Sequence, residues 1–191
     1  MGESFFENKE FKHVNYSGSP LPKGDYELCI FNNCDFLNAD LMEIKFIDCE
    51  FNDCNFSGAN ISNTAFQSVK FEGCKMLGLH FEYANPFGMS FSFSHCQLNH
   101  SSFYKLKLPR ITINFCNLEG VDFTEATLIG ADFGASDFKM ARFDRTNVEK
   151  SDFRGATNYQ IDVENNRIKG SKFNLDEVSG LLTKYNLKIE Q

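Results

Sequence analysis

Large apolar side chains recur at every fifth position over most of the chain. One series runs from Phe31 to Phe81, and a second, shifted by two residues, runs from Phe93 to Phe153. The two series hold 24 positions, all of them apolar and 15 of them Phe. A period of five matches neither a simple β-strand nor an α-helix, so it indicates a repeat architecture. The positions are Phe31, Phe36, Leu41, Phe46, Phe51, Phe56, Ile61, Phe66, Phe71, Met76, Phe81, Phe93, Leu98, Phe103, Leu108, Ile113, Leu118, Phe123, Leu128, Phe133, Phe138, Phe143, Val148 and Phe153.

A second selected position lies two residues before most of these centres and holds a small side chain. All seven cysteines take this position, and alanine is the other common residue there. Inward positions are therefore separated by two residues and then by three, which predicts a short strand followed by a corner. The corner position is rich in residues that tolerate a positive φ: Asn33, Asn38, Gly58, Asn63, Gly73, Gly78, Gly120, Gly130 and Gly155.

The cysteines also form rows with a spacing of twenty residues. Cys34, Cys54 and Cys74 make one row, which Cys96 and Cys116 continue after the two-residue shift, and Cys29 and Cys49 make another. Twenty residues per turn correspond to four five-residue sides, with equivalent residues stacked in columns. The pattern thus predicts a square coil, whose handedness it leaves open.

The five-residue units resemble those of the pentapeptide-repeat family, whose pattern is A(D/N)LXX. Examples are Cys34-Asp35-Phe36-Leu37-Asn38 and Ala131-Asp132-Phe133. The resemblance covers about residues 25–155 and implies an all-β solenoid, a right-handed quadrilateral β-helix. About six turns at a β spacing of about 4.8 Å would span about 30 Å. Residues 1–24 are expected to form an irregular first coil, and residues 156–191 a last coil, a short α-helix and a short strand.

Residues 82–92 interrupt the repeat and absorb the two-residue shift. Ala84 keeps the small inward position, but Pro86 replaces the apolar centre. Two conformations fit this segment: an outward loop that exposes Phe87 or Met89, or a local repacking that buries both.

The C-terminal segment predicts a helix. Asn174 is a candidate N-cap with Glu177 three residues later. An apolar helical face and the short strand after it are suited to cap the last coil, to pair with a second copy, or both. The predicted dimerisation residues are Val178, Leu181, Leu182, Tyr185, Leu187 and Ile189.

This ending narrows the resemblance to the Qnr-type fluoroquinolone-resistance proteins and the related microcin-immunity proteins. In that group the C-terminal helix and strand form a two-fold dimer. The resulting rod resembles duplex DNA and binds DNA gyrase or topoisomerase IV. Where better-known members carry long loops between coils, this chain has only the two-residue excess near 82–92.

The charge of the chain is negative and unevenly placed. The formal net charge is −7, and residues 25–82 alone hold ten acids and three bases. Direct binding of nucleic acid is not expected, because phosphates require a cationic surface. The candidate acidic surface consists of Asp35, Asp40, Glu43, Asp48, Glu50 and Asp53.

No motif indicates catalysis, a cofactor or a metal. The seven cysteines form no CxxC pair, and His80, His95 and His100 are expected on the surface rather than in a zinc site. The N-terminus has no basic segment followed by an apolar run, and no stretch is long enough for a membrane helix. We therefore expect reduced, buried thiols in a cytoplasmic protein that is not an enzyme and does not bind membranes.

Two hypotheses for function remain side by side. The resemblance implies a homodimeric DNA mimic that binds a type II topoisomerase and confers fluoroquinolone resistance. The alternative is a scaffold or protein-interaction module with an unrelated partner, because folding alone explains most of the repeat. A β-helical enzyme acting on polysaccharide is a third reading, and it requires an acid/base cluster along one side.

Overall fold

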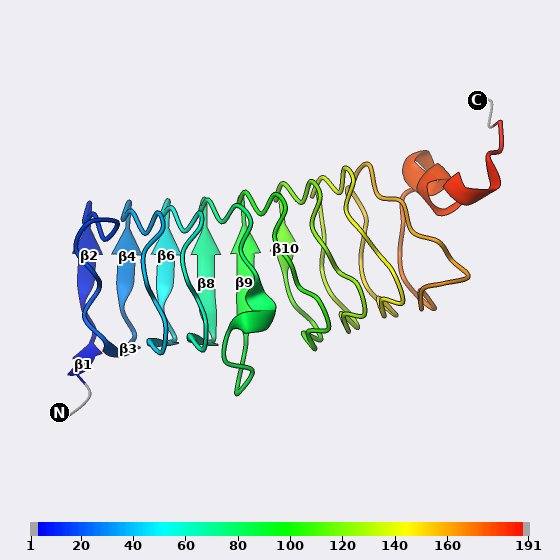
Figure 1. Ribbon diagram of the computed structural model, residues 1–191. Coiled ribbons are helices and arrows are strands. Elements are labelled where there is room, and N and C mark those ends of the chain that lie inside the picture. Colours follow the sequence, from blue (N-terminus) through cyan, green and yellow to red (C-terminus); the bar gives the residue numbers. More distant parts are fainter. Residues whose placement is uncertain (1–3, 189–191) are drawn as a thin grey trace.

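The protein is a straight rod, a right-handed quadrilateral β-helix that ends in short helices (Figure 1). This computed structural model describes residues 4–188. The repeat strands are short because each side of the coil provides only three or four extended residues before a corner. The elements are β1 (Ser4–Glu7), β2 (Glu10–Lys12), β3 (Gly24–Glu27), β4 (Ile30–Asn32), β5 (Lys45–Ile47), β6 (Glu50–Asn52), β7 (Ala65–Gln67), β8 (Val69–Glu72), η1 (Phe81–Tyr83), β9 (Phe91–Ser94), β10 (Ile113–Asn114), η2 (Leu175–Leu181) and η3 (Thr183–Tyr185).

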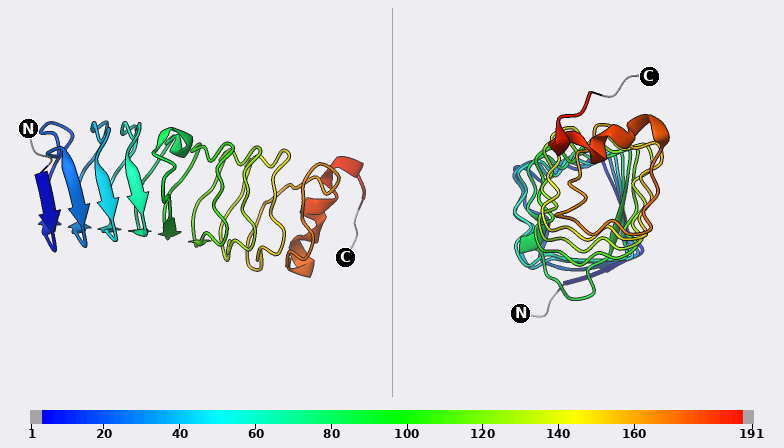
Figure 2. Two further views of the ribbon diagram at one scale, coloured as in Figure 1. Left: turned by 90° about the horizontal axis from the view of Figure 1, so that it is seen from below. Right: turned by 90° about the vertical axis from the view of Figure 1, so that its right-hand side faces the viewer.

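The coil has four sides, which we call faces A to D in chain order. Face A contains the parallel sheet β1-β3-β5-β7, and face B contains the parallel sheet β2-β4-β6-β8-β9-β10. Isolated parallel bridges extend the faces, with Asp35 paired to Asn55 on face C and Asp40 to Asn60 on face D. Pairs are twenty residues apart, as in Phe31 with Phe51, so the predicted square cross-section is confirmed (Figure 2).

The apolar centres fill the inside of the rod. All 24 predicted centres are buried. Rings of one face stack along the axis, with centroids 4.7 Å apart for Phe31–Phe51 and 5.3 Å apart for Phe51–Phe71. Rings of adjacent faces meet edge-on, as in Phe46–Phe51 at 5.1 Å. These are the two geometries that aromatic pairs favour, and each buried ring stabilises the rod by roughly 1.5–3 kcal/mol before entropy is counted.

The small inward position also satisfies backbone carbonyls of the preceding coil. The Cys49 thiol donates to the carbonyl of Tyr26 (3.2 Å), the Ser101 hydroxyl to Met76 (2.7 Å) and the Thr146 hydroxyl to Phe123 (2.8 Å). All seven cysteines are buried and free. Burial raises the pKa of the Cys49 thiol to about 12. The thiols are thus packing groups with a weak donor role rather than reactive sites.

Every predicted corner has a positive φ, and so do corners that composition did not indicate. Asn33 has φ 53° and Gly58 has φ 67°, but Phe115 (56°) and Met140 (58°) adopt the same left-handed conformation. Because the stacked coils force a turn at each corner, the backbone accepts residues that rarely choose this region on their own.

The interruption forms an outward loop. Asn85 still pairs with Ala65 on face A, after which the chain leaves the coil and rejoins it at β9. Phe87 is 80% exposed, whereas Met89 is half-buried against the core. The loop projects from the lower edge of the rod in Figure 1. Of the two expected conformations, the structure has the outward loop, in which Phe87 but not Met89 is exposed.

The C-terminal helix is present, but its geometry differs from the expectation. η2 and η3 are 3₁₀ helices rather than an α-helix. Asn174 makes no side-chain cap within η2; its Oδ1 atom instead accepts from the Gly155 amide, 3.2 Å away. The tighter winding lets Gly180 lie against Tyr159, where a Cβ would come within 2.1 Å of the Tyr159 carbonyl oxygen. Leu187 and Lys188 form no strand, and Ile189 lies outside the described residues.

Candidate interaction surfaces

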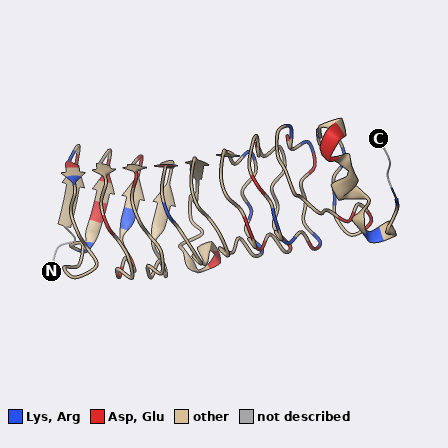
Figure 3. Cartoon of the chain, turned by 90° about the horizontal axis from the view of Figure 1, so that it is seen from above, with Lys and Arg blue, Asp and Glu red and all other residues tan. Residues whose placement is uncertain are grey.

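The six predicted acidic residues form a belt around the rod rather than a patch on one face. Asp35 lies on face C, and Asp40 and Glu43 lie on face D with its corner. The remaining three follow along the chain. Asp48 is at the corner between faces A and B, Glu50 lies on face B, and Asp53 is at the corner where face B ends. Red and blue segments recur along the whole rod in Figure 3. The belt presents negative charge in every direction but over little length.

Two of these acids also have a local structural role. The Asp35 Oδ1 atom accepts from the Leu37 amide (3.1 Å) and from the Asn55 side-chain amide of the next coil (3.1 Å). Asp40 repeats this arrangement with Met42 and Asn60. These turns explain why Asp and Asn alternate within the columns. An Asp-to-Asn change at such a position removes charge while it keeps the acceptor.

The other acids differ in how far they are neutralised. Glu50 pairs with Lys70 at 2.9 Å, and this carboxylate raises the pKa of Lys70. Asp53 lies over Gly73, whose absent Cβ leaves room for its carboxylate. Asp48 and Glu43 occupy exposed corners. The pair between Glu50 and Lys70 is exposed and contributes little to stability.

The predicted dimerisation residues do not form one exposed stripe. Leu181 packs against the core, and Val178 and Leu182 are half-buried. The Tyr185 hydroxyl donates to Glu164 (2.7 Å), so this ring is fixed against the last coil. The amine of Lys184 lowers the pKa of both Asp162 and Glu164. The helices therefore cap the last coil, which is one of the two uses expected for this segment, the other being contact with a second copy.

An open groove lies beside this cap. It has a volume of about 660 Å³ and lies between the helices and face C. Met140 (75% exposed) and Leu187 (57% exposed) line it with Leu182. Tyr159 also lines it, but its hydroxyl is buried without a hydrogen-bond partner among residues 4–188, and burial raises its pKa to about 12. Exposed apolar surface thus remains at this end, partly from Met140, which the sequence did not single out.

The histidines lie at the surface, as expected. The Nδ1 atom of His95 donates to the Glu72 carboxylate (2.8 Å) and its ring stacks on Phe115, while His80 stacks on Tyr83. Within the described part of the chain, no group of three or more His, Cys, Asp and Glu residues is arranged to hold a metal ion. No helix in that part is long and apolar enough to cross a membrane.

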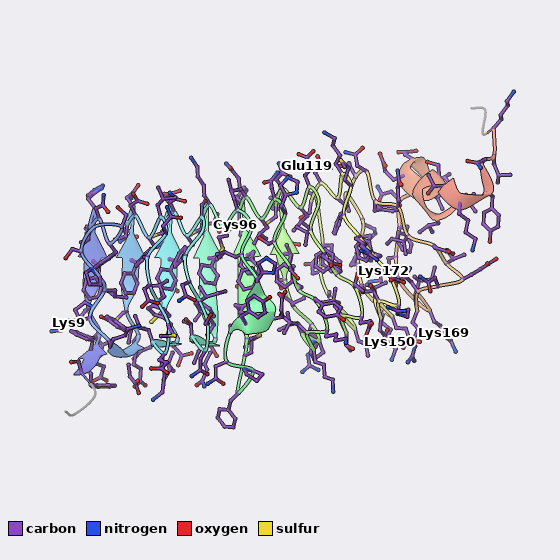
Figure 4. The ribbon with its side chains drawn as sticks, viewed as in Figure 1. Lys9, Cys96, Glu119, Lys150, Lys169 and Lys172 are labelled. Atoms are coloured by element: carbon purple, nitrogen blue, oxygen red, sulfur yellow. The ribbon has the colours of Figure 1, made fainter. Side chains whose placement is uncertain are left out.

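One charged surface was missed by the sequence analysis. The C-terminal half of face A gathers basic residues, and Lys150 and Lys169 lie near the lower edge of the rod below Lys172 (Figure 4). The sequence does contain a signal for this basic surface. When charged residues are aligned at a spacing of twenty, as for the cysteine rows, Lys107 and Arg167 fall in the same column.

Comparison with protein-family models identifies the repeat. A model described as a pentapeptide repeat region matches residues 25–92, and a model of eight pentapeptide repeats matches residues 116–155. Together these segments make up more than half of the chain. The chain belongs to the pentapeptide-repeat family. A search of curated proteins found no match for this pentapeptide-repeat protein.

Solved structures place it among rods of the same fold. A trypsin-treated form of QnrB1, a plasmid-mediated fluoroquinolone resistance protein, is 22% identical over 98% of each chain, with a TM-score of 0.55. HetL from the cyanobacterium Nostoc sp. strain PCC 7120, a pentapeptide repeat protein involved in heterocyst differentiation regulation, is 13% identical over 89% of this chain and 85% of its own, with a TM-score of 0.50. The two relatives share a fold and have different roles.

Proposed function

We propose that this pentapeptide-repeat protein is a non-enzymatic rod that binds a type II topoisomerase by imitating DNA. The observation that carries the proposal is the acidic belt, which makes one coil in the N-terminal half of the rod negative from every side, as a duplex is. A cationic DNA-binding groove attracts such a cylinder over several ångströms. The fold shared with QnrB1, a plasmid-mediated fluoroquinolone resistance protein, supports a role in fluoroquinolone resistance.

The proposal includes a homodimer formed at the C-terminal end. Apolar side chains around the groove supply its contact surface, chiefly Leu182, Leu187 and Met140. Such a dimer would double the negative charge and the length of the rod. It buries side chains that otherwise meet water.

The fold offers a way to test mimicry without disturbing the core. Neutralising the six acids of the belt replaces Asp with Asn and Glu with Gln. Asn already occupies the equivalent turn positions (Asn55, Asn60) and corners (Asn33, Asn38), so the coil is expected to persist. In a DNA gyrase supercoiling assay, the wild-type protein at micromolar concentration should inhibit the enzyme or rescue it from a fluoroquinolone. The neutralised variant should lose this effect.

A control removes three negative charges from the other half. Asp122, Asp132 and Asp137 occupy the turn position on three faces beyond the loop, and their change to Asn should leave the effect on gyrase nearly intact. If the wild-type protein has no effect on supercoiling, or if both variants act like it, the mimicry proposal is wrong.

The dimer is tested separately by gel filtration. Leu182→Asp with Leu187→Asp should convert the dimer to a monomer, because each change places a charge in an apolar contact. Leu181→Asp is less informative, since Leu181 also packs against the core. If the double variant still elutes as a dimer, the C-terminal end is not the dimer contact.

A second candidate is an interaction module for a different protein. Phe87 favours it, because an 80% exposed aromatic side chain on a loop tip is a typical binding anchor. If supercoiling is unaffected and Phe87→Ser abolishes capture of a partner that the wild-type rod retains, this candidate replaces the first.

A further inference from the structure

Face A carries opposite charge in its two halves. Before the loop its outward residues and the adjoining corner hold four acids and one base, net −3: Glu7, Asp25, Glu27, Lys45 and Asp48. After the loop they hold five bases and one acid, net +4: Lys107, Arg110, Glu149, Lys150, Arg167 and Lys169. We call this surface, defined by these eleven residues, the bipolar face. Mixed surface charge is ordinary, but segregation along one face is not required by the fold.

Most of these charges are not neutralised within the chain. Arg167 pairs with Glu149 at 2.9 Å, and Lys45 pairs with Asp25 at 3.1 Å. Across residues 4–188, no ion pair joins the remaining four bases to an acid, and all four are exposed: Lys107, Arg110, Lys150 and Lys169. The acids Glu7 and Asp48 are exposed as well. Each half therefore keeps charge available for a partner.

The loop with Phe87 lies at the midpoint between the halves. Four levels of face A precede it, the strands of the sheet β1-β3-β5-β7. Four levels follow it, at Lys107, Thr127, Asn147 and Arg167. The bipolar face thus carries its acids at levels one to three, an aromatic side chain at level five and its bases at levels six, eight and nine; levels four and seven hold no charged residue.

We propose that the bipolar face binds a second copy of this chain in antiparallel orientation. A two-fold axis at the loop would place level one opposite level nine, and so on inward, because an isologous contact pairs each patch with its counterpart. Glu7 then faces Lys169 of the second copy, and Ile47 faces Ile129. The two Phe87 loops lie side by side at the axis, which gives an aromatic centre with a polar periphery.

The corner positions fit this pairing in detail. Asp48 at level three faces Gly130 at level seven, where a missing side chain leaves room. Arg110 and Lys150 flank that glycine one level to each side, and Arg110 is the cation directed toward the carboxylate of Asp48, because the stem of Lys150 lies over Gly170. Arg110 already extends over Gly130, with its Cγ atom 3.6 Å from the position a Cβ would take.

A second copy matches the surface better than a polyanion does. Nucleic acid along the basic half would meet the acidic half on the same face and a chain of net charge −7. A reversed copy brings the net negative half opposite the net positive half at both ends, although Glu27 then faces Glu149. This lateral, ionic contact is distinct from the C-terminal dimer and does not depend on it, because the C-terminal contact is apolar and lies at the end of the rod.

Charge reversal with complementation tests the proposal. One variant, Lys150→Glu with Lys169→Glu, takes the basic half from net +4 to zero; the other, Glu27→Lys with Asp48→Lys, takes the acidic half from net −3 to +1. Lys is compatible with the corner of Asp48, because Lys105 and Lys150 occupy equivalent corners with φ 60° and 62°. In sedimentation velocity at low salt, wild-type protein should show a lateral association that high salt removes. Each variant alone should associate at least about tenfold more weakly.

Mixing the two variants should restore the association in part, because the unchanged acidic half of the first variant (net −3) then meets the unchanged basic half of the second (net +4). Circular dichroism spectra equal to those of wild type exclude unfolding, and Lys150→Gln with Lys169→Gln provides a milder variant with the same expected direction. A wild-type mass independent of salt overturns the proposal, and so does a mixture that fails to associate. If wild-type protein remains unassociated and its basic half instead binds a short DNA duplex, the surface is a polyanion site and the second copy is excluded.

Discussion

Replacement of Phe51 by Ala tests whether the stacked ring column stabilises the rod. Phe51 is fully buried at the centre of face B, between Phe31 at 4.7 Å and Phe71 at 5.3 Å, and edge-on to Phe46 at 5.1 Å. Removal of a buried Phe ring costs about 3–5 kcal/mol. The neighbouring rings are held by their own stacks and cannot close the cavity, so we expect about 4 kcal/mol.

That free energy corresponds to a large change in melting temperature. An unfolding entropy of about 2.1 cal/mol/K per residue gives about 0.4 kcal/mol/K for this chain, so about 4 kcal/mol lowers Tm by about 10 °C. Thermal unfolding followed by far-UV circular dichroism measures the shift. Phe51→Leu should cost less than half as much, because Leu occupies equivalent centres such as Leu41.

The control is a ring at the end of the rod. Phe173 is half-buried and stacks on one side, on Phe153 at 5.0 Å. Phe173→Ala should therefore lower Tm by only a few degrees. If Phe51→Ala is no more destabilising than Phe173→Ala, the column does not carry the stability assigned to it.

The remaining predictions concern the thiols and the cap. Burial holds the pKa of the Cys49 thiol at about 12, whereas a thiol in the unfolded chain has a pKa of about 8.5. The buried neutral thiol therefore contributes its full stability below about pH 8.5, and this contribution is lost as the pH rises toward 12. The urea midpoint should fall between about pH 8 and pH 11, and a thiol reagent should label native protein far more slowly than unfolded protein; rapid native labelling contradicts the burial. Gly180→Ala should displace η2, because the new Cβ would lie 2.1 Å from the Tyr159 carbonyl oxygen, and hydrogen exchange should rise there and not in the central coils. Gly18→Ala, with nothing within 4 Å, is the matched control and should change neither region.

The sequence predicted the coil because the same physical demand is repeated in every unit. A buried ring such as Phe31 and a small neighbour such as Cys29 leave a signal at each turn, and twenty-residue rows follow from stacking. The corners at Phe115 and Met140 follow from the five-residue period but not from their residue types, since the stacked backbone overrides local preference there. The exposure of Phe87 depended on a choice between two conformations that the residues alone did not decide.

The surfaces were less predictable than the core. The acids around Asp48 were identified, but their distribution over four sides depends on which corner each occupies. Asn174 has the residue type of an N-cap, yet the amide of Gly155 competes for its oxygen in the folded chain. Gly180 packs against Tyr159 of the last coil. This contact joins two separate segments, so no local sequence pattern could predict it.

The projecting loop has a consequence for how this rod can change in evolution. Because it absorbs both extra residues, the coils beyond it return to register, and Phe93 still lies beside Phe71. Addition or loss of twenty residues would alter only the length, by one β spacing of about 4.8 Å. Loss of a single five-residue unit would instead turn everything downstream by a quarter turn. The alignment of acidic and basic halves along one side therefore survives duplication of whole coils but not of single units.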